Sequence, residues 1–232
     1  MLIIGHRGAA DLARENTLEA LRAGVDADAD ILEFDVRLTK DGVFVLNHDF
    51  HTLRTHHSAS IISHHTLREL QARLGAAPVV TLEEVLDEFF GKIMLNIELK
   101  GMGSGKAIAA FMKKHYIKKK EDWDNVFFSS FFGRELVSLR RASQYANLAL
   151  LHHENPFLFI GYHRRITLSA VGFHRLYVNR LALEIAKRLR LFTYAYTVNR
   201  TPTAAYLAEK GIDAVVTNNP AKIYAELKKY QA

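Results

Sequence analysis

Carboxylate side chains recur two residues apart in the N-terminal half of this 232-residue chain. Glu33 and Asp35 lie in one apolar run, and Glu98 lies near the end of another. Because alternate residues of a β-strand face the same side, Glu33 and Asp35 share one face, as do Glu98 and Lys100. Buried carboxylates are unfavourable unless they are paired or bind a metal. Converging acids in a chain without cysteine therefore favour a hard divalent cation, Mg²⁺ or Ca²⁺, over zinc.

Basic and imidazole side chains follow other apolar runs. His6 and Arg7 come directly after the first run, and His48 follows a later one. Histidine accepts or donates a proton near neutral pH, while arginine and lysine bind phosphate. A metal, the two histidines and the cations Arg7 and Lys100 would together form a site that cleaves a phosphodiester.

Each of these groups, taken alone, also has a simpler interpretation. Glu33 and Asp35 could be ion-pair partners of Arg7 and Lys100, and a single histidine is more often structural. All of the groups, however, fall at the ends of strands that are predicted independently. This coincidence favours the catalytic interpretation.

Eight short, nearly continuous apolar runs alternate with helix-like segments, as is typical of strands buried on both faces of a parallel sheet. The runs cover residues 2–4, 31–36, 93–99, 126–128, 148–151, 170–173, 191–198 and 214–216. The chain contains neither of the glycine-rich phosphate loops of open doubly wound sheets. We therefore predict an α/β fold, a (β/α)₈ TIM barrel, with the polar groups at the carboxyl ends of its strands.

One connection is too short for a helical crossover. Asp41-Gly42 predicts a hairpin turn, so residues 43–47 should return antiparallel to residues 31–38. The following segment, to about residue 78, is polar and rich in histidine, and we expect it to cap the site. The prediction is one catalytic domain over residues 1–232, with a hairpin and a small cap insertion at about 43–78 after the second strand.

Composition places few further limits on function. The net charge of +6 arises partly from a basic run at residues 113–120, which is more typical of the C-terminal end of a helix than of a nucleic-acid site. The chain has no apolar run of membrane-spanning length and no signal-peptide pattern at its start. We expect a cytoplasmic enzyme with a small-molecule substrate, no nucleic-acid partner and no integral membrane segment.

Several motifs, in order and with similar spacing, resemble those of the glycerophosphodiester phosphodiesterases over essentially the whole chain. They are His6-Arg7-Gly8, Glu15-Asn16-Thr17, Glu33-x-Asp35, Asp41-Gly42, His48-Asp49, Glu98-x-Lys100, Thr197-Val198-Asn199 and Gly211-Ile212-Asp213. The family fold is a (β/α)₈ barrel with a hairpin-like insertion. The resemblance implies hydrolysis of a glycerophosphodiester to glycerol 3-phosphate and an alcohol.

The resemblance also implies a role for each site residue. Glu33, Asp35 and Glu98 would bind one divalent cation, and His6 and His48 would be the general base and acid, in an order left open. Arg7 and Lys100 would hold the phosphate. Glu15 would orient an arginine or help to bind the metal. Three further residues would line the substrate pocket: Ser129, Phe131 and Tyr196.

Some positions depart from the family pattern. Tyr196 replaces a frequent tryptophan, which leaves substrate preference open, and Asn218 replaces a frequent aspartate. Asn16 is a candidate N-cap of the helix that follows it. Of the remaining histidines, His153 is the one that could reach the barrel mouth.

Two alternatives remain. A longer apolar groove would permit action on lysophospholipids, as in a lysophospholipase D. A barrel that only binds phosphorylated metabolites would instead lack a catalytic group, yet both histidines and all three acids are present.

Overall fold

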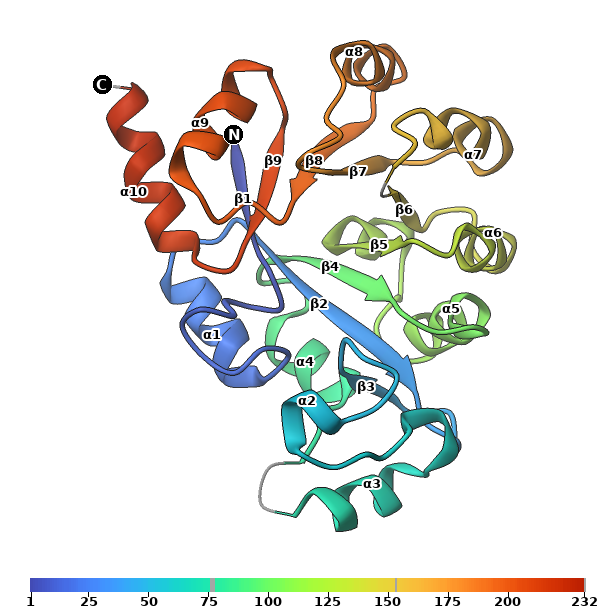
Figure 1. Ribbon diagram of the computed structural model, residues 1–232. Coiled ribbons are helices and arrows are strands. Elements are labelled where there is room, and N and C mark those ends of the chain that lie inside the picture. Colours follow the sequence, from blue (N-terminus) through green and yellow to red (C-terminus); the bar gives the residue numbers. More distant parts are fainter. Residues whose placement is uncertain (76–77, 153, 232) are drawn as a thin grey trace.

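Eight parallel strands close into a barrel in the computed structural model, which describes residues 1–75, 78–152 and 154–231 (Figure 1). The strands are β1 (Leu2–Gly5), β2 (Ile31–Leu38), β4 (Met94–Leu99), β5 (Val126–Ser130), β6 (Asn147–His152), β7 (Ala170–His174), β8 (Phe192–Tyr196) and β9 (Ala214–Thr217). Pairing of β1 with both β2 and β9 closes the sheet. The predicted TIM barrel is therefore confirmed, and each of the eight expected runs forms one of its strands.

Helices surround the barrel, as Figure 1 shows. They are α1 (Leu18–Asp26), α4 (Leu82–Phe89), α5 (Ser104–His115), α6 (Gly133–Ala142), α7 (Leu158–Ile166), α8 (Arg180–Arg188), α9 (Thr201–Glu209) and α10 (Pro220–Gln231), with the short 3₁₀ turn η2 (Lys120–Asn125) before β5. Phe34 and Ile97, which alternate with the acids along β2 and β4, belong to the main core, together with apolar helix residues such as Leu86 and Ile108. Burial on this outer face leaves the acids on the inner face.

The inner face of the barrel changes character along its axis. Ile4, Ile31, Phe127 and Tyr194 belong to an apolar cluster within the barrel. Toward the carboxyl end of β2 the inward positions become acidic. The parallel register of β2 and β4 places Glu33 beside Asn96 and Asp35 beside Glu98.

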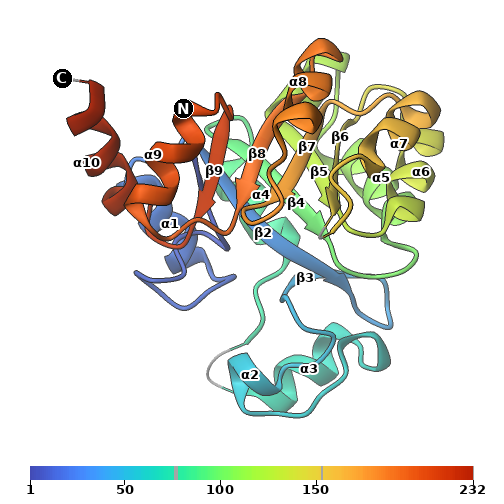
Figure 2. The ribbon, with the colours of Figure 1, turned by 45° about the horizontal axis from the view of Figure 1, so that its top comes forward.

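The predicted hairpin is also present. Strand β3 (Phe44–Leu46) pairs antiparallel with the end of β2, with Val36 opposite Leu46. The chain then forms α2 (Leu53–His56), the 3₁₀ turn η1 (Ile62–His64) and α3 (Leu67–Leu74) before it returns to the barrel. Figure 2 shows α2 and α3 beside β3, to one side of the barrel.

The insertion has a small core of its own. Val45, Ile62, Leu70 and Val79 form a buried cluster that is separate from the main core. We keep the name cap for the segment from residue 49 to residue 75, although none of its described residues lines the hollow at the barrel mouth that is described below.

Asn16 is not the N-cap of α1, because its side chain contacts β2; the cap is Thr17, whose hydroxyl accepts from the amide of Ala20. Helix α5 ends at His115, so only the first part of the basic run is a helix end. His153 lies outside the described residues. In the described part of the chain no helix is long and apolar enough to cross a bilayer.

Candidate active site

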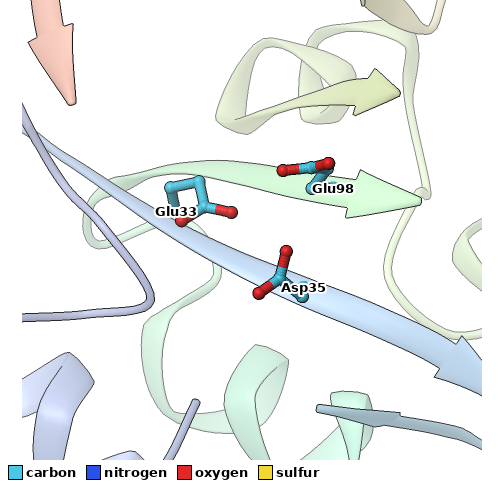
Figure 3. Close-up of side chains that lie close together, drawn as sticks. All are labelled: Glu33, Asp35 and Glu98. Carbon is cyan, nitrogen blue, oxygen red and sulfur yellow. The ribbon is translucent and has the colours of Figure 1, made fainter. Parts of the chain in front are cut away.

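Three carboxylates converge inside the barrel, two of them on β2 and the third near the carboxyl end of β4. Glu33, Asp35 and Glu98 each offer one oxygen, and these oxygens all lie within 4.8 Å of one another (Figure 3). Their exposed fractions are 3%, 1% and 7%. The convergence expected from the two-residue spacing is therefore present.

The neighbouring cations do not satisfy all three acids. Lys100 Nζ contacts both Asp35 and Glu98, and Arg7 Nε lies 3.1 Å from Asp35 Oδ2. The expected ion pairs thus exist, but they centre on Asp35. The buried Glu33 Oε1 has no hydrogen-bond partner in the described structure. An all-oxygen donor set with an unsatisfied carboxylate oxygen fits a hard divalent cation.

The pKa values of the three acids also show that the neighbouring cations stabilise the charge of Asp35 more than the charges of Glu33 and Glu98. Burial, and then the nearby Asp35 charge, raise the pKa of Glu33 to about 8. Burial also raises the pKa of Glu98 to about 7, although Lys100 opposes the shift. Burial would raise the pKa of Asp35 too, but Lys100 and Arg7 hold it below its ordinary value. A bound cation would favour the carboxylate forms of Glu33 and Glu98 and so oppose both upward shifts.

A tight turn after β1 connects the first motif to this cluster. Arg7 and Gly8 both have left-handed backbone angles, with φ of 51° and 87°. The turn allows the Arg7 amide to donate to Glu33 Oε2 at 2.8 Å and the Gly8 amide to donate to the Glu33 carbonyl at 2.9 Å. A Cβ on Gly8 would lie 2.4 Å from the backbone of Ala20, so only glycine fits.

Asn16 holds the middle acid in place. Its side-chain amide donates to Asp35 Oδ2 at 3.0 Å, and its oxygen accepts from the Asp35 amide at the same distance. Asn16 has a left-handed φ of 57°, which asparagine tolerates better than most residues. This pairing explains why Asn16 is unavailable as a helix cap.

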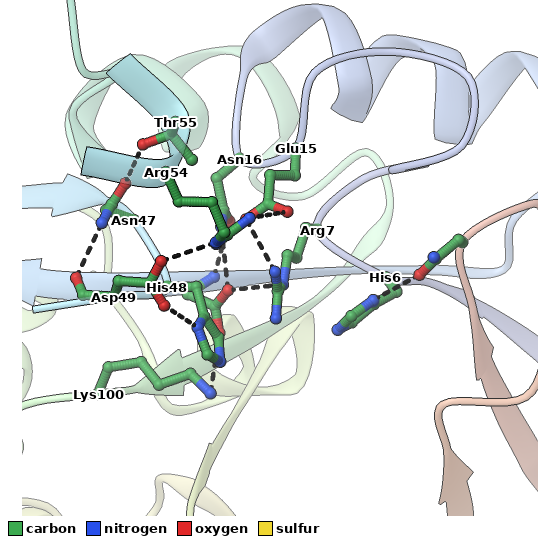
Figure 4. Close-up of polar contacts among 12 residues, drawn as sticks. His6, Arg7, Glu15, Asn16, Asn47, His48, Asp49, Arg54, Thr55 and Lys100 are labelled. Carbon is green, nitrogen blue, oxygen red and sulfur yellow. Dashed lines mark hydrogen bonds and ion pairs between the residues drawn. The ribbon is translucent and has the colours of Figure 1, made fainter. Parts of the chain in front are cut away.

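Arg7 and Glu15 form the contact expected from the motifs. Arg7 Nη1 donates to Glu15 Oε1 at 2.8 Å, and Glu15 also receives two hydrogen bonds from Arg54 of the cap (Figure 4). Glu15 therefore contacts two guanidinium groups and is not a member of the three-acid cluster. Nothing in the sequence distinguished Arg54, because 39 residues separate it from Glu15.

The two histidines differ in their partners. His6 Nδ1 lies 2.7 Å from Asn218 Oδ1, whose own amide nitrogen donates to Asp11. His48 Nδ1 lies 2.8 Å from the carboxylate of Asp49. In both cases the partner is an acceptor, so Nδ1 carries the proton and Nε2 remains for chemistry.

Burial affects both imidazoles in the same direction. It lowers the pKa of His6, with Arg7 as the next cause. Burial likewise lowers the pKa of His48, while the contact with Asp49 opposes the shift. Both rings are therefore largely neutral at pH 7 in the described state.

A hollow of about 500 Å³ opens at the barrel mouth above the acids. His6, His48, Arg7 and Lys100 line it together with Phe131, Tyr196 and Glu98. The geometry thus brings both histidines and both cations to one space. Arg37 also lines this hollow, and its guanidinium donates to the carbonyls of His48 and Lys100, a role that the sequence analysis missed.

The expected pocket residues lie at different depths. Lys100 Nζ stands 5.5 Å from the centre of the Phe131 ring. Tyr196 packs edge-on against Phe131 and uses its hydroxyl to donate to the His152 carbonyl. Ser129 is fully buried and lines a deeper space of about 30 Å³ below the mouth. Tyr196 and Phe131 are thus wall residues of the mouth, whereas Ser129 lies beneath it.

The chain is therefore a TIM barrel whose mouth combines a cluster of buried acids with the cations Arg7 and Lys100 and two histidines. The model of the glycerophosphoryl diester phosphodiesterase family matches residues 6–222. The chain belongs to this family and is a phosphodiesterase.

Relatives match over nearly the full length. The chain is 32% identical to YhdW of Bacillus subtilis (strain 168) over 234 residues, covering 95% of each chain. It is 26% identical to a glycerophosphodiester phosphodiesterase of Caldanaerobacter subterraneus subsp. tengcongensis, covering 98% of each.

Two solved structures show the same fold. The glycerophosphodiester phosphodiesterase of Thermotoga maritima has 25% identity and a TM-score of 0.81, with 98% of each chain covered. A phosphodiesterase of Oleispira antarctica, solved with its product sn-glycerol-3-phosphate, has 24% identity and a TM-score of 0.85, with coverage of 98% of this chain and 97% of that one.

Proposed function

We propose that this enzyme hydrolyses glycerophosphodiesters to glycerol 3-phosphate and an alcohol, with one divalent cation, Mg²⁺ or Ca²⁺, held by Glu33, Asp35 and Glu98. The observation that carries the proposal is the convergence of these acids beneath a mouth lined by both His6 and His48. The Caldanaerobacter relative carries this activity in its name, and the Oleispira structure holds the corresponding product.

The side chains at the barrel mouth have different roles in binding the substrate. Arg7 and Lys100 bind the anionic phosphodiester, since both extend into the hollow from the ends of their strands. When bound, the cation would act as a Lewis acid that stabilises negative charge on phosphoryl oxygen. These contacts would place the phosphorus between the two imidazoles.

We assign the general base to His6 and the general acid to His48. His6 has a neutral amide partner and a lowered pKa, so its Nε2 is free to accept the proton of the attacking hydroxyl. Burial leaves His48 largely neutral without substrate, but the Asp49 carboxylate opposes this shift and favours the imidazolium form, which is the form that protonates a leaving alkoxide.

Release of glycerol 3-phosphate from a panel of glycerophosphodiesters tests the proposal. We expect EDTA to abolish release and added Mg²⁺ or Ca²⁺ to restore it. His6→Ala and His48→Ala should each lower kcat by ~10²–10⁴-fold, whereas His115→Ala on the outer helix α5 serves as the matched control. Turnover that is indifferent to EDTA, or near wild-type turnover in both site variants, would refute the assignment. Turnover of lysophosphatidylcholine in preference to glycerophosphocholine would instead identify a lysophospholipase D.

A further inference from the structure

The guanidinium of Arg54 joins two carboxylates at the edge of the mouth. Its Nε donates to Asp49 Oδ2 at 2.7 Å, and its Nη1 and Nη2 donate to the two oxygens of Glu15, also at 2.7 Å. Arg54 belongs to α2 of the cap, whereas Glu15 lies in the loop after β1 (Figure 4). The side chain therefore fastens the cap to the barrel.

Each of these two carboxylates also accepts a hydrogen bond from a residue of the site. Asp49 Oδ1 accepts from His48 Nδ1 at 2.8 Å, and Glu15 Oε1 accepts from Arg7 Nη1 at 2.8 Å. Among the residues that the structure describes, Arg54 is the one whose side chain hydrogen-bonds to both the Glu15 and the Asp49 carboxylates. One side chain of the cap thus supports the proton-transferring imidazole and the phosphate-binding guanidinium together.

We propose that Arg54 is a positioning residue of this phosphodiesterase, which fixes His48 through Asp49 and Arg7 through Glu15. The inference rests on the proposed function of His48 and Arg7. A planar guanidinium suits this role because its N–H donors point in fixed directions and can hydrogen-bond to two carboxylates at once. An ammonium group cannot reproduce this geometry. Without it, each carboxylate could rotate, and misplacement of reacting groups by about 1 Å can cost ~10²-fold in rate.

The cap has other attachments, so loss of Arg54 should not unfold it. The Asp41 carboxylate accepts from the Leu67 amide, and Thr55 donates to Asn47. The small core around Leu70 is also independent of Arg54. A variant at Arg54 therefore tests position more than folding.

The first experiment measures kcat, KM and the thermal unfolding midpoint of Arg54→Ala and Arg54→Lys. We expect kcat of Arg54→Ala to fall ~10–100-fold while the unfolding midpoint stays close to that of the wild type, and Arg54→Lys to recover only part of the loss. Arg22→Ala is the matched control, because Arg22 makes a similar two-bond contact with Glu88 on the outer surface. Unchanged kcat, or a loss that disappears at temperatures where the variant is fully folded, would overturn the proposal.

A second experiment asks whether Arg54 acts through Asp49. In an Asp49→Asn background, Arg54→Ala should have a smaller effect on kcat than in the wild type, because the path to His48 is already broken. Equal effects in both backgrounds would contradict this path.

A third readout does not require hydrolysis. Imidazole ¹⁵N NMR of the wild type should show His48 with its proton on Nδ1 in slow exchange with water, and Arg54→Ala should accelerate that exchange, while Arg22→Ala should not. No difference between the variants would exclude positioning of His48. Because this readout needs no turnover, it stays decisive even if no glycerophosphodiester is hydrolysed, an outcome that would refute the proposed function alone.

Discussion

At the residue scale, the contrast between Asn218 and Asp49 distinguishes two otherwise similar histidines. Both bind the Nδ1 side of an imidazole, but only Asp49 carries a charge. A carboxylate favours the imidazolium by its charge as well as by its hydrogen bond, whereas the Asn218 amide oxygen favours it by the hydrogen bond alone. This difference underlies our choice of His6 as base and His48 as acid.

Asn218→Asp should raise the pKa of His6, because a carboxylate would then face Nδ1. A general base must be deprotonated, so the acidic limb of the kcat/KM profile should move to higher pH, by about one unit or more. The measurement is kcat/KM against pH, with Asn219→Asp as a control that places the same charge one residue away. Movement of the alkaline limb would show that His6 is the acid, contrary to our assignment.

Metal binding should release protons near neutral pH. The pKa of Glu33 is raised to about 8 and that of Glu98 to about 7, against an ordinary value of 4.5. A bound cation requires both as carboxylates, so its affinity should increase as the pH rises from 6 to 8. Calorimetric titration of the protein with Mg²⁺ or Ca²⁺ in buffers of different ionisation enthalpy measures the protons released.

The raised pKa values of Glu33 and Glu98 also make the stability of the metal-free protein depend on pH. Between about pH 7 and 8 the folded chain binds more protons at Glu33 and Glu98 than the unfolded chain, so the free energy of unfolding should fall as pH rises through this window. At lower pH His6 and His48, whose pKa values are lowered by burial, have the opposite effect. Thermal unfolding in EDTA measures this trend, and a saturating cation should reduce it. Proton uptake on metal binding, or affinity that declines with pH, would contradict both expectations.

Residue types and spacing predicted which side chains come together only where local periodicity determines geometry. Glu33, Asp35 and Glu98 converge because alternation along two strands leaves them on one face. The bonds of Arg54 to Glu15 join segments 39 residues apart through a loop and a short helix, where no periodicity applies. For the same reason Asn16 suggested a local helix cap, whereas its true partner, Asp35, lies on a strand.

At the scale of elements, the turn after β1 does more than end a strand. It directs the amides of Arg7 and Gly8 at Glu33 while it sends the Arg7 side chain toward Asp35 and Glu15. A single left-handed turn therefore couples the Arg7 side chain to the acid cluster.

Gly8→Ala should disrupt this turn. The added Cβ would meet backbone atoms of α1 at 2.4 Å, and the residue would keep an unfavourable φ of 87°. We expect destabilisation of several kcal/mol, at least ~1–3 kcal/mol from the backbone angle alone, measured by chemical unfolding. Gly42 also has a positive φ, but a Cβ added there would meet open space. Gly42→Ala therefore measures the cost of the backbone angle without the steric clash. Equal losses in the two variants would disprove the proposed clash.

The elements themselves were largely predictable. Strands buried on both faces give continuous apolar runs, and the Asp41-Gly42 turn marked β3. The cap was not resolved into α2, η1 and α3, because its helices are short and its buried apolar residues few. Short helices depend on tertiary packing more than on propensity, so sequence alone says little about them.

At the scale of the whole molecule, stability and function are unevenly distributed. The main core extends through the barrel and its helices, whereas the cap depends on a cluster of four buried residues that includes Ile62 and Leu70. Regions with few buried contacts open locally at a lower free energy than the global transition. The cap carries Arg54, so its opening would remove the support of His48 and Arg7.

Leu70→Ala should therefore uncouple activity from global stability. Removal of a fully buried leucine costs ~2–5 kcal/mol, and here the loss falls on the cap. We expect faster amide hydrogen exchange in the cap, with little change in the barrel strands. Activity should decline at a lower temperature than the one at which the barrel unfolds.

Leu136→Ala supplies the matched comparison, because Leu136 of α6 is equally buried but belongs to the main core. In that variant, loss of activity and barrel unfolding should occur together. If Leu70→Ala also lost activity only when the barrel unfolds, the cap would not be a separate cooperative unit. Arg54 would then not be lost from the site by independent opening of the cap, because the cap and the barrel would unfold together.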